Sequence, residues 1–257
     1  MQPSYTVKLM QAIHRANLDV LSKQRVLGDH MHLPVSVNRG MSLASMLVTT
    51  KEPEFAWPVF QAFWQELQRP GRPPVLIATD GLHHAMRVSK YRDASFNLIH
   101  AHDLALLRLF ADALGGRTPF PGGGAVLGVT SDNNKPTLPS VDKAVEQAAA
   151  AQAAAVAAAV AQAQGLPPPP PAPLPQRDPY YRFYDERVFA ALSGVGVQRV
   201  AGMTRPETRA LLEYWAASGV LRQRVTDYTV AEQWTMGGGG MPAEMERVAL
   251  FDNRVSM

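Results

Sequence analysis

Two short apolar segments, separated by one helical pattern, constrain the fold of this chain more than any other feature. VLIATD, residues 75–80, and GAVLGV, residues 124–129, are rich in Val, Leu and Ile. Runs of this length are typical of parallel strands that are covered on both faces. Residues 99–114 lie between them with apolar side chains at helical spacing, and Gly115 ends the pattern. Two strands joined by a helix form a βαβ unit, so we predict an α/β fold with a parallel sheet.

Composition limits the class of protein. With 257 residues, 46% of them apolar and 18% charged, the chain has the composition of a globular protein with one large domain or two small ones. It contains no cysteine, which excludes a disulfide framework and a thiolate zinc site. The formal net charge of +3 permits a polyanionic partner without requiring one. No apolar run approaches the roughly 20 residues that cross a bilayer, so we expect no membrane segment.

The N-terminal part contains two helical patterns. Residues 5–26 carry apolar side chains at helical spacing with Lys and Arg among them, which predicts a basic amphipathic helix. Residues 55–68 place Phe60, Phe63 and Trp64 on one stripe. We interpret this stripe as core that docks the helix on the sheet, in preference to a base-stacking platform.

The C-terminal part contains a helix start signal. Thr204 and Glu207 have the spacing of a capping box, and the helix they predict ends at Gly219. The preceding segment, GVQRVAGM at residues 196–203, is a candidate for a third strand. Residues 236–240 predict a flexible glycine-rich loop, and no strand and helix flank it as a phosphate-binding loop requires.

An acidic residue ends the first apolar strand. Asp80 lies where a Walker B carboxylate would lie, at the carboxyl edge of a parallel sheet, where it would hold Mg²⁺ against nucleotide phosphates. The second strand ends in Thr130 and Ser131, and in P-loop ATPases of the AAA type the strand beside Walker B also ends in a polar residue. The sequence has no G-x-x-x-x-G-K-[ST] loop to cradle the phosphates. The pattern therefore predicts half of a nucleotide site.

Histidines follow the first strand. His83 and His84 lie directly after it, and His100 and His102 lie beside Asp103. This set permits a zinc site, but adjacent histidines on one segment and His-x-His on another do not have the spacing of ligands on one helix face. We favour capping, packing or RNA contact for these side chains.

A small basic segment lies between the histidine pairs. RVSKYR contains Arg87, Lys90 and Arg92 with Tyr91 among them. Such a segment suits RNA, because cationic side chains contact phosphates and an aromatic ring stacks on bases. The alternative is a solvated basic face.

Low-complexity composition divides the chain. Residues 144–164 contain mostly Ala, Gln and Val, and GLPPPPPAPLP follows them. Alanine favours a helix and the proline run favours extended polyproline II, so we predict an inserted arm. We assign residues 1–143 to a partial core with the Walker B strand, 144–176 to the Ala- and Pro-rich insert, and 177–257 to the end of the core and a C-terminal helical or lid region.

Several of these segments together resemble the death-associated protein 3 family in its fungal form. Members of this family are P-loop GTPase-like proteins of the mitochondrial ribosomal small subunit. The similarity is carried by DGLHHAMRVSKYRDASFNLIHAHDLALLRLF, GGGAVLGVTSDNNKP, YYRFYDERV and GMTRPETRALLEYWAASGVLRQRV. It implies an AAA-type, P-loop NTPase-like fold that binds a guanine nucleotide with Mg²⁺. By position, Asp80 matches the Walker B acid, and Thr130 and Ser131 match the polar end of the neighbouring strand.

The resemblance also implies a function. It predicts a structural constituent of the mitochondrial small ribosomal subunit, in the matrix, that contacts rRNA and neighbouring ribosomal proteins and serves translation. The family's lysine-containing loop and presequence have no counterpart here, so we expect an N-terminally incomplete form. The alternatives are an active AAA-like ATPase or regulatory NTPase, and a His/Asp metal hydrolase.

Overall fold

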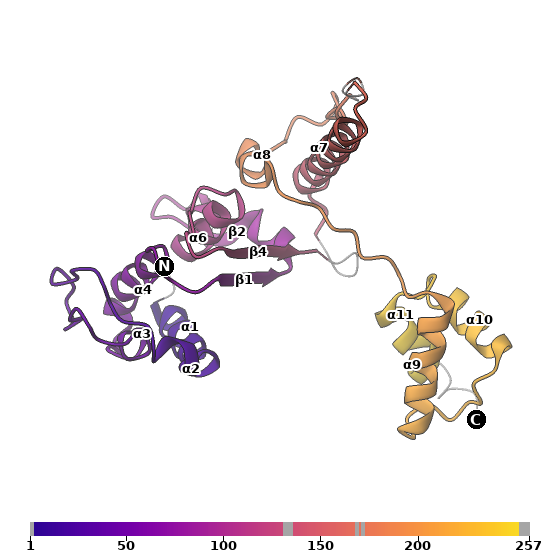
Figure 1. Ribbon diagram of the computed structural model, residues 1–257, viewed down its shortest axis with the longest axis horizontal. Coiled ribbons are helices and arrows are strands. Elements are labelled where there is room, and N and C mark those ends of the chain that lie inside the picture. The colour runs from indigo at the N-terminus through magenta and orange to yellow at the C-terminus, as the bar shows by residue number, and fades with distance from the viewer. Residues whose placement is uncertain (1–2, 131–135, 168–169, 171–172, 252–257) are drawn as a thin grey trace. The chain divides into compact units, whose positions relative to one another are not determined.

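The chain divides into two compact units, Met1–Val197 and Gln198–Met257. The computed structural model describes residues 3–130, 136–167, 170 and 173–251, and Figure 1 shows the order of their helices and strands. The boundaries that we predicted from composition, at residues 143 and 176, stay predictions.

The first unit contains the predicted parallel strand pair. Strand β1 (Val75–Asp80) pairs in parallel with β4 (Gly124–Val129), and helix α6 (Ala105–Leu114) lies between them in the sequence. The predicted α/β fold is confirmed at this level. Helix α6 ends at Leu114 with Gly115 as its C-cap, as the glycine signal predicted, but it begins later than the predicted residue 99, because residues 98–103 form a strand and a 3₁₀ helix.

The predicted coverage of both sheet faces is wrong. Ile77 and Val126 pack against the hydrophobic cores of the first unit, but Leu76 on the opposite face is 69% exposed and Leu127 is 48% exposed. An apolar run predicts a strand, but it does not show whether helices cover both of its faces. The predicted third strand at residues 196–203 is also wrong: this segment forms no strand, and Val200 is 88% exposed.

Helices at the N-terminus form the first hydrophobic core. Its interior includes Met10, Phe60, Phe63 and Trp64, so the aromatic stripe is core, as predicted. The helix predicted over residues 5–26 is shorter and interrupted. The helices of this region are α1 (Pro3–Ala16), α2 (Leu18–Leu21), α3 (Leu43–Leu47) and α4 (Pro53–Leu67).

A buried carboxylate joins helix α4 to the loop before α3. The Glu66 side chain is 0% exposed and accepts hydrogen bonds from the backbone N–H groups of Leu27 (2.9 Å) and Gly28 (2.7 Å). His30 Nε2 lies 3.0 Å from the same carboxylate. Burial acts to raise the pKa of Glu66, but these hydrogen bonds and the nearby Arg69 charge outweigh it and lower the pKa to about 2.

The same carboxylate fixes the turn that leads into β1. Arg69 Nε donates to Glu66 Oε1 (2.9 Å), and the buried Arg72 donates both to the Glu66 carboxylate and to its backbone carbonyl (2.8 Å). Charge-assisted hydrogen bonds are stronger than neutral ones. Glu66 therefore ties α4, the 27–30 loop and the start of β1 to one another.

A second core lies under α6. Phe110, Val141 and Val188 are buried there together. The elements around it are α5 (Leu82–Ala85), the antiparallel hairpin of β2 (Val88–Arg92) and β3 (Leu98–His100), the 3₁₀ helix η1 (Ala101–Asp103), α7 (Pro139–Ala163) and α8 (Glu186–Leu192).

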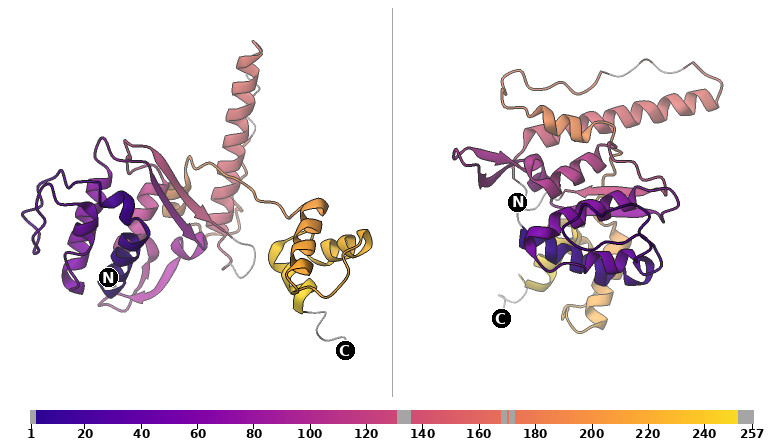
Figure 2. Two further views of the ribbon diagram at one scale, coloured as in Figure 1. Left: turned by 60° about the horizontal axis from the view of Figure 1, so that its bottom comes forward. Right: turned by 90° about the vertical axis from the view of Figure 1, so that its left-hand side faces the viewer.

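Helix α7 contains the Ala-rich tract. Its first turns belong to the core, since Val141 and Ala144 are buried, whereas Val156 and Val160 near its end are exposed. The returning chain lies alongside it, where Gln147 Nε2 donates to the Pro175 carbonyl oxygen (2.9 Å) (Figure 2). By length and composition alone α7 is also long and apolar enough to cross a membrane, which is weak evidence because its first turns pack in this core.

The second unit is helical. Thr204 and Glu207 form the predicted capping box at the start of its first helix. Its core includes Leu212, Val230 and Met245. The helices are α9 (Arg205–Ala217), α10 (Asp227–Met236), α11 (Pro242–Glu246) and the π-helix η2 (Arg247–Phe251).

The glycine-rich loop of this unit is an ordered turn, which corrects the flexible loop we predicted. Met203 N donates to the Gly240 carbonyl oxygen (2.8 Å), and Trp234 Nε1 donates to the Met203 carbonyl oxygen (2.7 Å). Gly240 has a φ of +85°, and a Cβ there would collide with the Met203 backbone. Glycine is required because the chain that enters α9 passes directly against this loop.

We expect Glu66→Gln to reduce the free energy of unfolding of the first unit by about 3 kcal/mol at pH 7, because it leaves the Arg72 guanidinium buried without its carboxylate. The folded pKa of Glu66 is about 2, below its ordinary 4.5, so this stabilisation is present above pH 4.5 and is lost as the pH falls toward 2. Denaturant-dependent hydrogen exchange in α4 measures it. Glu54→Gln, on the exposed side of the same helix, is the control; equal effects of both variants at pH 7 would contradict the assignment.

We expect Gly240→Ala to destabilise the second unit by at least about 2 kcal/mol more than Gly219→Ala. Both glycines have positive φ, but nothing lies within 4 Å of a Cβ at Gly219, so that variant carries only the backbone strain of about 1 kcal/mol. Hydrogen exchange in α9 and α10 measures the difference. Indistinguishable variants would show that the Met203 contact does not constrain the loop.

Candidate functional site

The parallel register brings the predicted nucleotide-site residues to one edge of the sheet. Asp80 is aligned with Val129, so Asp80 and Thr130 both lie at the carboxyl end of the strand pair. Both residues are exposed, and Asp80 Oδ1 accepts a hydrogen bond from Gly81 N (2.7 Å). Ser131 lies outside the residues that the structure describes.

This edge supplies a carboxylate and a hydroxyl, which are ligands that Mg²⁺ prefers. Over the described ranges of the chain, Asp80 forms no ion pair with a lysine or arginine. No glycine-rich lysine loop occurs in the sequence to hold phosphates. What the edge offers is therefore limited to oxygen groups of the kind that Mg²⁺ prefers.

Three of the four histidines make capping or packing contacts, and the fourth is exposed. His100 accepts a hydrogen bond from His102 N (3.1 Å) and caps η1, while its Nε2 lies 3.3 Å from Asp185 Oδ2 in poor hydrogen-bond geometry. His83 Nε2 lies 3.4 Å from Asp142 Oδ1. Within the described residues no group of three or more His, Asp or Glu side chains is placed to hold a metal ion.

Burial keeps two of these histidines uncharged at neutral pH. It lowers the pKa of His102 to about 4, with the neighbouring His100 as the next cause. It also lowers the pKa of His100, to which the Arg187 charge contributes. The neutral form is the one that burial favours.

The predicted basic segment forms the first strand of the β2–β3 hairpin, which the sequence reasoning missed. Lys90, Tyr91 and Arg92 are exposed, and Arg87 is half-buried. The pairing of β2 with β3 is irregular between Val88 and Arg92, so this stretch does not follow the simple alternation of a regular strand.

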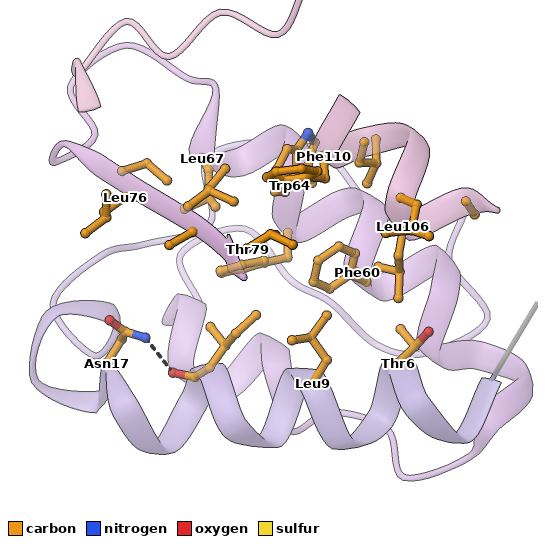
Figure 3. A pocket seen from close by; sticks show the side chains of 18 of the residues that line it. Thr6, Leu9, Asn17, Phe60, Trp64, Leu67, Leu76, Thr79, Leu106 and Phe110 are labelled. Atoms are coloured by element: carbon orange, nitrogen blue, oxygen red, sulfur yellow. Dashed lines mark hydrogen bonds between the residues drawn. The ribbon is translucent and has the colours of Figure 1, made fainter. Parts of the chain in front are cut away.

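A cavity of about 760 Å³ lies along β1 between α1, α4 and α6. Figure 3 shows Leu9, Phe60, Trp64 and Leu106 in its walls. All residues from 75 to 79 line it, so it follows the edge of β1 and not only one face of the sheet.

The edge of β1 that faces this cavity has no partner strand. β1 pairs with β4 and, in the described part of the chain, with no other strand. In a parallel pair the backbone groups of alternate residues point away from the partner, so those of Leu76 and Ala78 face the cavity. This open edge was not predicted, because an apolar run is the same in an edge strand and in a central one.

Comparison with known proteins identifies relatives of this chain. A family model described as mitochondrial ribosomal death-associated protein 3 matches residues 1–248. The small ribosomal subunit protein mS29 of Neurospora crassa is 44% identical over 253 residues, which are 97% of this chain and 50% of that protein. The protein of the same name from Schizosaccharomyces pombe is 24% identical over 232 residues, 88% of this chain and 43% of that protein.

The chain thus spans about half the length of the curated relatives it matches. The family match extends over both compact units, from the first residue into η2. The resemblance seen in the sequence is confirmed, and the chain belongs to the mitochondrial ribosomal death-associated protein 3 family.

Proposed function

We propose that this protein is a structural constituent of the small subunit of the mitochondrial ribosome, located in the matrix, where it contacts rRNA and neighbouring ribosomal proteins. The observation that carries the proposal is the match over 97% of the chain to a protein named small ribosomal subunit protein mS29. The exposed basic hairpin supports it, because Arg87, Lys90, Tyr91 and Arg92 suit phosphates and bases.

We propose further that the sheet is part of a P-loop NTPase-like core of the AAA type. The parallel pair with a helix between its strands supports this, and so does the position of Asp80 beside Thr130. A two-stranded parallel sheet is marginal by itself, and unpaired backbone groups next to an apolar cavity need hydrogen-bond partners. A further strand on the edge of β1 would supply those partners.

The guanine nucleotide of this proposal fits the present residues only in part. Asp80, Thr130 and Ser131 would form the side of the site that faces Mg²⁺, and the bound nucleotide would stabilise the fold without turnover. The sequence supplies no lysine loop for the phosphates. We therefore propose that the role of Asp80 in this chain is structural.

The ribosomal proposal predicts co-sedimentation. Tagged protein from a mitochondrial lysate is expected in the small-subunit fraction of a sucrose gradient, and to leave that fraction when magnesium is chelated and the subunit unfolds. Its persistence in the soluble fractions at the top of an intact gradient would refute the proposal.

The structural proposal also predicts negligible catalysis. Purified protein with Mg²⁺ and GTP or ATP is expected to turn over at least about 100-fold more slowly than the roughly 1 per second of ordinary enzymes. Asp80→Asn is expected to leave this background rate unchanged. A rate near 1 per second that Asp80→Asn abolishes would establish the rival, an active AAA-like NTPase.

A further inference from the structure

The β2–β3 hairpin has no cover on either face at its outer end. Every residue from 90 to 98 is exposed. The strands pair at Val88 with His100 and at Arg92 with Leu98, and the register between these pairs is irregular. An isolated two-stranded hairpin is only marginally stable in water. This projecting hairpin therefore has the properties of an element that binds a partner.

The tip of the hairpin displays an aromatic ring in a strained backbone conformation. Phe96 has a φ of +64°, and among the described residues it is the only one other than glycine with a positive φ. Its side chain is 78% exposed, so packing within the chain does not explain its presence. A bulky residue in this region of φ is unfavourable, and such strain is characteristic of functional sites.

The Asp93 side chain builds the turn that presents Phe96. Its carboxylate accepts hydrogen bonds from Ser95 N (2.8 Å), Asn97 N (2.8 Å) and Asn97 Nδ2 (3.2 Å). The backbone closes the same turn, with Phe96 N donating to the Asp93 carbonyl oxygen (3.0 Å). The hydrogen bonds from Asn97 lower the pKa of Asp93, so the carboxylate is ionised at neutral pH. The backbone of the tip is thus fixed before any partner binds.

The strand that leads into the tip carries two cations, Lys90 and Arg92. The Arg92 guanidinium donates to the Phe96 carbonyl oxygen. The acidic residue of the tip, Asp93, accepts hydrogen bonds from the backbone N–H groups of the turn. A protein pocket for Phe96 would have to desolvate these cations at a cost, whereas a phosphate backbone neutralises them. Charge complementarity therefore favours a nucleic acid.

We propose that Phe96 stacks on an unpaired base of RNA, with Lys90 and Arg92 at the flanking phosphates and Asp93 as the positioning residue for the ring. An unpaired base is specified because the deep, narrow major groove of an RNA duplex excludes side chains, whereas splayed bases stack on aromatic rings. The proposal rests on the ribosomal function proposed above. It adds a base-contacting residue that the basic segment alone did not indicate.

Filter binding of the purified full chain to mitochondrial small-subunit rRNA transcribed in vitro tests the proposal. We expect Phe96→Leu to weaken binding roughly tenfold and Phe96→Tyr to retain it, because stacking needs a flat ring. Phe183→Leu is the control, since Phe183 is also an exposed aromatic residue of the first unit, at 82%. We expect it to bind as the wild type does.

Salt dependence separates the two kinds of contact. The double variant Lys90→Ala with Arg92→Ala is expected to lower the slope of log K against log salt by about 1.4, since each phosphate contact in single-stranded RNA contributes about 0.7. Phe96→Leu is expected to keep the wild-type slope. The proposal would be overturned if Phe96→Leu bound RNA as tightly as the wild type, or if Phe96→Leu and Phe183→Leu lost the same affinity. It would also be overturned if the wild type did not bind RNA.

The backbone strain gives an independent readout. Phe96→Gly is expected to raise the thermal unfolding temperature slightly, because glycine adopts positive φ without strain, and at the same time to weaken RNA binding as Phe96→Leu does. A variant that is both more stable and fully competent in binding would contradict a role for the ring. Loss of the small-subunit association with RNA binding intact would instead refute the ribosomal function alone.

Discussion

The buried carboxylate of Glu66 is the interaction on which the geometry of the first unit depends. It joins the loop at residues 27–30, helix α4 and the turn that leads into β1 through charge-assisted hydrogen bonds in a site with no solvent exposure. Because Arg72 lies just before Val75, the same carboxylate fixes where β1 begins. The position of Asp80 at the end of that strand follows from it.

The strand pair so positioned carries part of the nucleotide site that we propose. Its carboxyl edge has the acidic and hydroxyl groups of Asp80 and Thr130, and its β1 edge faces an apolar cavity with unpaired backbone groups. These two features are compatible with the proposed role as a structural part of a larger complex. The described residues offer two contact surfaces, an exposed basic hairpin and an open strand edge.

The sequence predicted what depends on local pattern and missed what depends on tertiary partners. The parallel strands, the helix before Gly115 and the capping box at Thr204 were predictable, because spacing and cap chemistry act within a few residues. Glu66 gave no signal, since its partners at residues 27–30 lie far away in the sequence. The open sheet face at Leu76 and the tip at Phe96 were missed because exposure depends on what does or does not pack above a segment. For the site, Asp80 and Thr130 were placed together correctly, whereas the hairpin that carries Lys90 and Arg92 was not foreseen.

We propose that this chain is built into a ribosomal subunit as a structural part. Electron cryomicroscopy of mitochondrial small subunits, purified through a tag on this protein, is the decisive experiment. We expect density for both compact units within the particle, the Phe96 tip against unpaired rRNA, and a covered edge of β1. Particles without density for this chain, or with the hairpin and the β1 edge both facing solvent, would contradict it.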